Sequence, residues 1–67
     1  MEKILGILRF ALAREIEGRE FYKEKATRAK SKEVRDTLES LWKMEEEHVE
    51  FIKSLMEKVQ SDIEIDV

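Results

Sequence analysis

Eight residues in the second half of this chain follow one another at separations of 4, 3, 4, 3, 4, 3 and 4. They are Val34, Leu38, Leu41, Glu45, His48, Ile52, Leu55 and Val59. Residues with these separations lie along one face of an α-helix, so the pattern predicts a long helix with one apolar stripe. Glu45 and His48 interrupt that stripe with a carboxylate and an imidazole, which need a partner wherever they are buried.

The first half of the chain carries a second helical pattern. Its apolar line consists of Ile4, Leu8, Ala11, Glu15, Gly18, Tyr22 and Ala29, and it is widened by Leu5, Leu12 and Ile16. We therefore expect one helix over about residues 2–29 and another over about 32–60. Ser31 is the expected N-cap of the second helix, and Glu33 and Asp36 place negative charge in its first turn.

The two apolar faces are out of phase with each other. The line of the first helix, extended beyond Ala29, reaches the charged residues Asp36 and Lys43. One straight helix therefore cannot bury both faces on the same side. A tight turn near residues 30–32 resolves this conflict and predicts an all-α fold, an antiparallel hairpin over residues 1–60.

A hairpin of this size needs further support. A core within 67 residues rarely supplies more than ~3–5 kcal/mol of stability, and the chain has no Cys to form a disulfide. The remaining supports are a metal ion, a partner chain, or both. Four large residues beside the second stripe also need cover, namely Trp42, Val49, Phe51 and Met56. A second copy of the hairpin provides it, so we expect a four-helix bundle in a homodimer or a larger even-numbered oligomer.

Composition excludes some functions. The net charge is −3 and no basic face emerges, which argues against nucleic acid as a partner. No apolar run approaches the length of a membrane span, and the N-terminus lacks the pattern of a signal peptide. We therefore expect no membrane association and a location in the cytoplasm or in a compartment inside it.

The last seven residues, 61–67, form a separate tail in this interpretation. Ile63, Ile65 and Val67 alternate with acidic residues, which is the pattern of a half-buried strand. Such a strand is too short to stand alone, so pairing with another copy, disorder, or continuation into a longer chain are the alternatives.

Glu45 and His48 are three positions apart and so lie on adjacent turns of one helix face. Glu45 is expected to point inward among apolar neighbours, whereas Glu46 is expected on a solvated stripe. That stripe also contains Glu39, Glu50 and Lys53. A metal ion is the most economical partner for an inward carboxylate beside an imidazole. The alternative is an accidental Glu-x-x-His pair on a solvated face.

Glu15 interrupts the apolar line of the first helix at mid-length, as Glu45 and His48 do in the second. Mid-helix positions meet in an antiparallel hairpin, so the three residues are expected to form one site. Each chain contributes two carboxylates and one imidazole, so a dimer contributes four carboxylates and two imidazoles. Four carboxylates close together in a low-dielectric interior must be protonated or balanced by cations. Two divalent ions balance them. The alternative is an ion pair between Glu15 and a Lys or Arg of the other helix, a role that Arg19, four residues along the same helix, could partly fill.

Two segments resemble a known family. The stretch Ala-Arg-Glu-Ile-Glu-Gly-Arg-Glu-Phe-Tyr, which ends at Tyr22, resembles the first helix of rubrerythrin-like and encapsulated-ferritin-like proteins. In that helix a ligand Glu precedes a Tyr by seven residues, as Glu15 precedes Tyr22. Glu-Glu-Glu-His48 resembles the metal-binding segment of their second helix. The resemblance covers roughly residues 8 to 56, and the length fits the half-size encapsulated form.

The resemblance implies a ferritin-like fold and iron as cofactor, with two ions per dimer. The implied activity is a ferroxidase reaction, in which oxygen or peroxide oxidises Fe²⁺ for iron storage or detoxification. Glu15, Glu45 and His48 are the implied catalytic ligands, with Tyr22 beside them or, alternatively, as a core aromatic. An encapsulating shell protein is an implied further partner.

Two other functions remain open. The first is a metal-binding module without turnover, since carboxylate and imidazole ligands suit iron, zinc and manganese alike. The second is a purely structural assembly module, in which the inward polar groups fix the register of the helices. Uptake of oxygen after addition of Fe²⁺ separates the ferroxidase from both.

Overall fold

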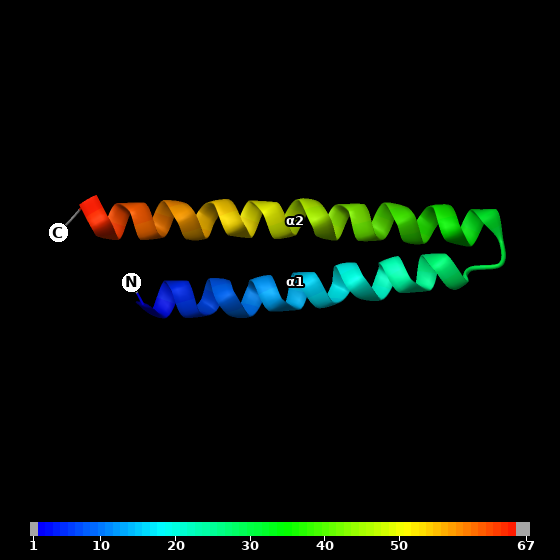
Figure 1. Cartoon of the computed structure of the whole chain (residues 1–67), viewed down its shortest axis with the longest axis horizontal. Helices are drawn as coiled ribbons and strands as arrows, with labels where there is room; N and C mark the ends of the chain where they lie inside the picture. The colour runs from blue at the N-terminus through cyan, green and yellow to red at the C-terminus, as the bar shows by residue number, and fades with distance from the viewer. Residues whose placement is uncertain (1, 66–67) are drawn as a thin grey trace.

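The chain forms two antiparallel helices that lie side by side along their length (Figure 1). The computed structural model describes residues 2–65, with α1 over Glu2–Arg28 and α2 over Lys32–Ile65. The hairpin is slender, with dimensions of 55 × 14 × 11 Å. The predicted all-α hairpin is confirmed, whereas its assembly with a second copy stays a prediction.

The turn between the helices is closed by local hydrogen bonds. At the end of α1, the amide of Ala29 donates to the carbonyl of Ala26 at 3.3 Å. At the start of α2, the hydroxyl of Ser31 accepts from the amide of Val34 at 3.1 Å, and its carbonyl accepts from the amide of Arg35 at 3.0 Å. Ser31 therefore is the N-cap that the sequence predicted, and it satisfies amides that lack an intrahelical acceptor.

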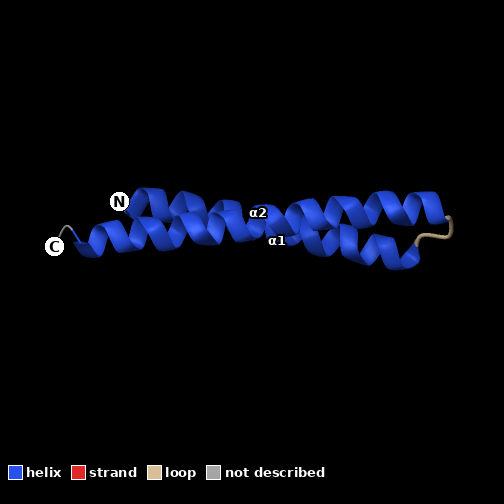
Figure 2. Ribbon diagram, turned by 90° about the horizontal axis from the view of Figure 1, so that it is seen from above, coloured by secondary structure: helices blue, strands red, loops and turns tan. Residues whose placement is uncertain are grey.

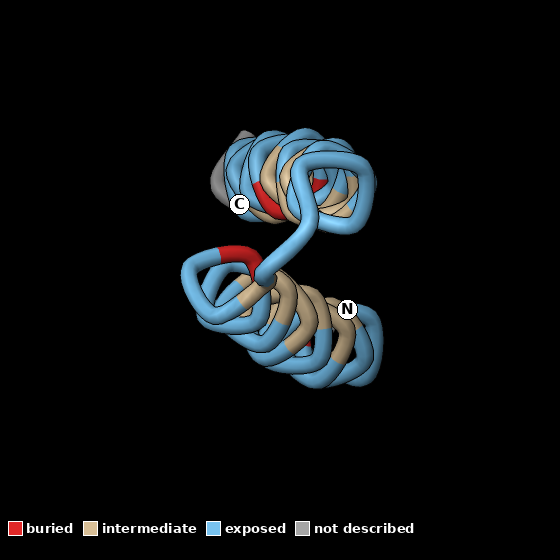
Figure 3. The backbone as a smooth tube through the Cα atoms, turned by 90° about the vertical axis from the view of Figure 1, so that its right-hand side faces the viewer, coloured by how far each residue is buried: buried red, intermediate tan, exposed pale blue. Residues whose placement is uncertain are grey.

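The core is a narrow seam between the two helices. Buried and half-buried residues lie on the sides where α1 and α2 face each other, and exposed residues cover the rest (Figure 3). The most buried apolar residues are Leu5, Ala26, Val49 and Ile52. Val49 is 0% exposed, although we expected it beside the stripe and not at its centre.

Val34 departs from the prediction in the opposite sense, because it was expected in the core and is 51% exposed. In α1, similarly, Leu5 is buried whereas Ile4 is 46% exposed. An α-helix drifts by about 20° per seven residues relative to a strict 4-3 repeat. The seam in the structure is therefore rotated from the line that the repeat draws through the sequence.

Seen from above, the two helices cross near their middles (Figure 2). This arrangement brings mid-helix residues of α1 and α2 face to face. Among the residues described, no helix combines the length and the apolar character that a membrane crossing requires.

The predicted strand in the tail is wrong for residues 61–65, because α2 continues through Ile65. The helix extends beyond the start of α1 (Figure 1). A strand needs a neighbour for its hydrogen bonds, whereas each residue added to a helix completes a bond within the helix. Residues 66 and 67, which belong to the same predicted strand, lie outside the described residues.

Candidate metal centre

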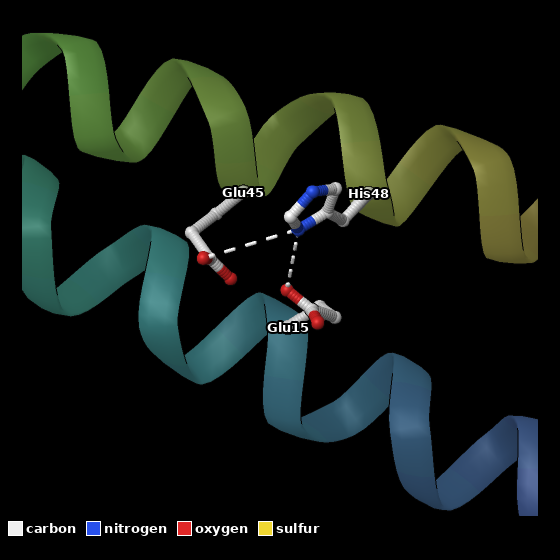
Figure 4. A group of neighbouring side chains, drawn as sticks. All are labelled: Glu15, Glu45 and His48. Carbon is white, nitrogen blue, oxygen red and sulfur yellow. Dashed lines mark hydrogen bonds and ion pairs between the residues drawn. The ribbon is translucent and has the colours of Figure 1, made fainter.

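Glu15 of α1 and Glu45 and His48 of α2 meet between the helices (Figure 4). Each offers one ligand atom, and these atoms lie within 4.8 Å of one another. The three-residue separation places Glu45 and His48 on adjacent turns, and the antiparallel turn brings Glu15 opposite them. The residues predicted to form one site are therefore neighbours in space.

The imidazole lies beside both carboxylates. His48 Nδ1 is 3.4 Å from Glu15 Oε2 and 4.0 Å from Glu45 Oε1. Both distances exceed those of a strong hydrogen bond between charged groups, so the imidazole is not locked to either acid. Three potential ligands thus converge, and the imidazole makes only long contacts with the two carboxylates.

The site is open on one side. The side chains of Glu45 and Glu15 are 23% and 29% exposed, whereas that of His48 is 53% exposed. The sequence analysis predicted that His48 is buried, and this prediction is wrong. The buried face of α2 is rotated towards Val49, which leaves His48 exposed. His48 lies on the outer edge of the contact between the helices, with the carboxylates behind it.

The pKa values of the two carboxyl groups are shifted in opposite directions. A hydrogen bond with Glu45 lowers the pKa of Glu15; burial opposes this shift, and the hydrogen bond to His48 and its charge add to it. The same bond to Glu15 raises the pKa of Glu45, with burial and the charge of Glu15 acting in the same direction. Two acids this close favour a state in which they share one proton, and a bound cation removes the need for that proton.

Gly18 makes room for Glu45. A Cβ at position 18 would stand 3.0 Å from Glu45 Oε2 and 3.4 Å from its Cδ. This is tighter than nine in ten real contacts of a Cβ, so a larger residue would require the carboxylate of Glu45 to shift by a few tenths of an ångström. The glycine therefore shapes the space in which the carboxylate of Glu45 lies beside Glu15.

Arg19 forms an ion pair across the helices, but not with the site. Its Nη1 donates to both carboxylate oxygens of Glu46, at 2.8 and 3.2 Å, and its Nε donates to Glu20 at 3.2 Å. These hydrogen bonds raise the pKa of Arg19, the bond to Glu46 most strongly. Glu46 is thus half-buried and paired, which corrects the expectation that it belongs to a solvated stripe.

Tyr22 follows Glu15 by seven residues, about two helical turns, and does not join the site. The ring is half-buried and packs edge-on against Phe21, with 5.5 Å between the centroids. Within the described part of the chain, its hydroxyl makes no hydrogen bond with Glu15, Glu45 or His48. A role for Tyr22 beside the ligands stays a prediction.

Comparison with known proteins places the chain in a family. The family model described as Rubrerythrin matches residues 6–67. The chain belongs to the rubrerythrin family. Searches of curated proteins and of solved structures each returned no significant match. Membership of the rubrerythrin family implies iron binding, and Glu15, Glu45 and His48 are a group that could hold a metal ion.

The residues present fit a divalent metal ion. Carboxylate oxygens and a neutral imidazole nitrogen are ligands that Fe²⁺ accepts. They converge from two helices, and Gly18 keeps the space of one ligand clear. A rubrerythrin-family metal site is therefore compatible with Glu15, Glu45 and His48 as they lie in the structure.

The sequence prediction missed the pairing of Arg19 with Glu46. The sequence does contain an indication of this pairing. Glu46 follows Glu45 by one position, so it lies at the other edge of the face that α2 turns to α1. Arg19 follows Glu15 by one turn and so occupies the same seam on α1. Only the crossing of the two helices decides which acid the guanidinium meets.

Proposed function

We propose that this rubrerythrin-family hairpin is a ferroxidase that oxidises Fe²⁺ at a site shared between two copies of the chain. The observation that carries the proposal is the convergence of Glu15, Glu45 and His48, whose ligand atoms lie within 4.8 Å of one another. These are the residue types that hold di-iron centres in ferritin-like bundles.

Charge supports two metal ions per pair of hairpins. One hairpin contributes two carboxylates and one imidazole, so two hairpins contribute four carboxylates and two imidazoles. Four negative charges in a partly dry site are balanced by two divalent cations. One hairpin alone leaves a metal ion with three protein ligands and an open side.

The exposed surface supports a second hairpin on that open side. Met44, His48 and Phe51 follow at separations of 4 and 3, so they share one side of α2. Met44 is 51% and Phe51 is 64% exposed. Further exposed apolar residues line α1, among them Ile7 and Phe10, each 67% exposed. Apolar residues exposed in such number mark an interaction surface, and the imidazole lies within it.

The chemistry divides between iron and protein. Iron bound at the site supplies the electrons, since two Fe²⁺ ions give two electrons that, with two protons, reduce oxygen to hydrogen peroxide or peroxide to water. Glu15 and Glu45 supply negative charge that favours the oxidised ions. His48 supplies a neutral nitrogen donor, and the apolar surface around it excludes water when a second hairpin covers the site.

Anaerobic titration with Fe²⁺ tests the ligand set. We expect one ion per chain for the unsubstituted protein and a loss of binding by at least about tenfold for Glu45→Ala and for His48→Ala. Glu47→Ala is the matched control, because it removes an exposed carboxylate between the two ligands. Unchanged stoichiometry and affinity in Glu45→Ala and His48→Ala would remove both residues from the site.

Admission of oxygen to the loaded protein then tests turnover. Consumption of oxygen with formation of Fe³⁺ is expected for the ferroxidase, and binding without consumption identifies a metal-binding module. A purely structural hairpin has a melting temperature that does not respond to divalent metal. For a metal site we expect a stabilisation of about 2.7 kcal/mol at a free metal concentration of 100 times Kd, reversed by a chelator.

A role in iron storage or detoxification, a cytoplasmic location and an enclosing shell protein stay predictions. The ferroxidase reaction favours them, since Fe³⁺ produced by the reaction needs a place to be stored. Sedimentation of the iron-loaded protein from a cell extract under native conditions tests the shell: a co-sedimenting protein of larger mass supports it.

A further inference from the structure

The side chain of Arg19 does not pair with Glu15, although its position on α1 favours that ion pair. Arg19 follows Glu15 by four residues, and a Glu followed by a basic residue at this separation is the favourable order for an ion pair along a helix. The guanidinium instead lies against Glu46 of α2, at 2.8 Å from one carboxylate oxygen and 3.2 Å from the other.

The pairing leaves the site acids without a basic side chain. Among the residues that the structure describes, Glu15 and Glu45 form ion pairs with His48 only. Their negative charge is therefore free to hold a cation. A guanidinium bound to Glu15 would compete for the same oxygens, because it occupies a carboxylate with two parallel hydrogen bonds.

Burial makes the choice of partner matter. The side chain of Arg19 is 21% exposed and that of Glu46 is 38% exposed, so water screens the charge of Arg19 less than that of a surface arginine. A partly buried guanidinium needs an acceptor. Besides Glu46, Arg19 already contacts Glu20, and Glu15 lies four residues before it, one turn away on the same helix. Glu20 is 57% exposed, so its ion pair with Arg19 is expected to be weaker than one with Glu15.

We propose that Glu46 is a positioning residue that holds Arg19 away from Glu15 and so keeps the carboxylates of the site open to a divalent cation. The inference rests on the proposed metal site and adds to it a residue that binds no metal. It also assigns unequal roles to three successive glutamates: Glu45 as ligand, Glu46 as the holder of Arg19, and Glu47 as a surface residue.

Anaerobic Fe²⁺ titration of Glu46→Gln tests the proposal. The variant keeps the shape of the side chain and removes its charge, so Arg19 turns to Glu15 and the affinity for Fe²⁺ falls about three- to fivefold. Glu47→Gln removes the same charge from the neighbouring exposed position and is expected to stay within about twofold of the unsubstituted protein.

The double variant Arg19→Met/Glu46→Gln separates this role from a merely structural one. It removes the competing guanidinium, so the affinity is expected to return to within about twofold of the unsubstituted protein. A crystal structure of Glu46→Gln is expected to show the guanidinium of Arg19 in contact with Glu15. If Glu46→Gln binds Fe²⁺ as Glu47→Gln does, or if the double variant is as weak as Glu46→Gln, the inference is overturned.

These outcomes are distinct from failure of the proposed function. Absence of Fe²⁺ binding by the unsubstituted protein overturns the metal site and the inference together. Intact binding, lost in His48→Ala but equal in Glu46→Gln and Glu47→Gln, overturns the inference alone.

Discussion

At the scale of single residues, the structure explains most clearly why a glycine occupies position 18. A glycine in the interior of a helix costs about 1 kcal/mol relative to alanine. Position 18 nevertheless faces the carboxylate of Glu45, which comes within 3.0 Å of where a Cβ would stand. Stability and site geometry therefore make opposite demands at this position.

Gly18→Ala is expected to raise stability and weaken metal binding at the same time. The helix gains up to about 1 kcal/mol from its improved propensity, because the carboxylate of Glu45 moves aside at small cost. The same movement takes a ligand away from Glu15 and His48, so the affinity for Fe²⁺ falls about tenfold. Thermal unfolding of the metal-free protein and anaerobic titration measure the two effects.

Gly6→Ala is the matched control, since a Cβ at position 6 meets nothing within 4 Å. It is expected to stabilise the helix by a similar amount and to leave Fe²⁺ affinity unchanged. Equal affinities in Gly6→Ala and Gly18→Ala would show that the carboxylate of Glu45 tolerates a Cβ and that Gly18 does not shape the site.

At the scale of elements, the contact between α1 and α2 depends on few side chains. Val49 alone among the large side chains described is fully buried, and it packs at the seam where the helices face each other. Near the turn, the ammonium of Lys23 lies 5.1 Å from the centre of the Trp42 ring and joins the helices by a cation–π contact. Such a narrow seam makes each buried contact count for a large share of the stability.

Val49→Ala is expected to destabilise the metal-free hairpin by about 2 kcal/mol, because it removes two buried carbon atoms and leaves a cavity. Urea unfolding followed by circular dichroism measures the loss. Val34→Ala makes the same chemical change at a residue that is 51% exposed, and its effect is expected to stay within about 0.5 kcal/mol. Similar losses in both variants would contradict the burial pattern of α2.

At the scale of the whole molecule, two helices do not cover their own apolar surface. Among the residues whose burial the structure describes, the large hydrophobic side chains at least 46% exposed are Ile4, Ile7, Phe10, Phe21, Val34, Met44 and Phe51. In the proposed dimer, a second hairpin covers exposed apolar residues and completes the ligands on the open side of the candidate metal site.

Phe51→Glu is expected to separate the copies. A carboxylate buried without a partner in the interface costs enough to weaken association about 100-fold or more. Sedimentation velocity is expected to shift from dimer to monomer, with a parallel loss of tight Fe²⁺ binding. Lys43→Gln changes the net charge by the same amount at an exposed position and is expected to leave both unchanged. A Phe51→Glu protein that remains dimeric with full metal affinity would contradict a shared site on this surface.

The sequence by itself determined the two helices, their turn and the meeting of the three ligands. Helix formation follows from local periodicity and from the Ser31 cap, and both are properties of neighbouring residues. Once the turn is fixed near residue 30, antiparallel chains pair positions at equal distances from it, so Glu15 opposes Glu45 and His48. Distance along the chain was sufficient for that result.

The tertiary structure alone decided how each helix is rotated about its own axis. That rotation buries Val49 and leaves Val34 and His48 exposed. It also places Arg19 in an ion pair with Glu46 and not with Glu15. It also brings the carboxylate of Glu45 against Gly18. The period of a helix defines a face to within a residue on either side, and only the packing of side chains across the seam selects one orientation within that range.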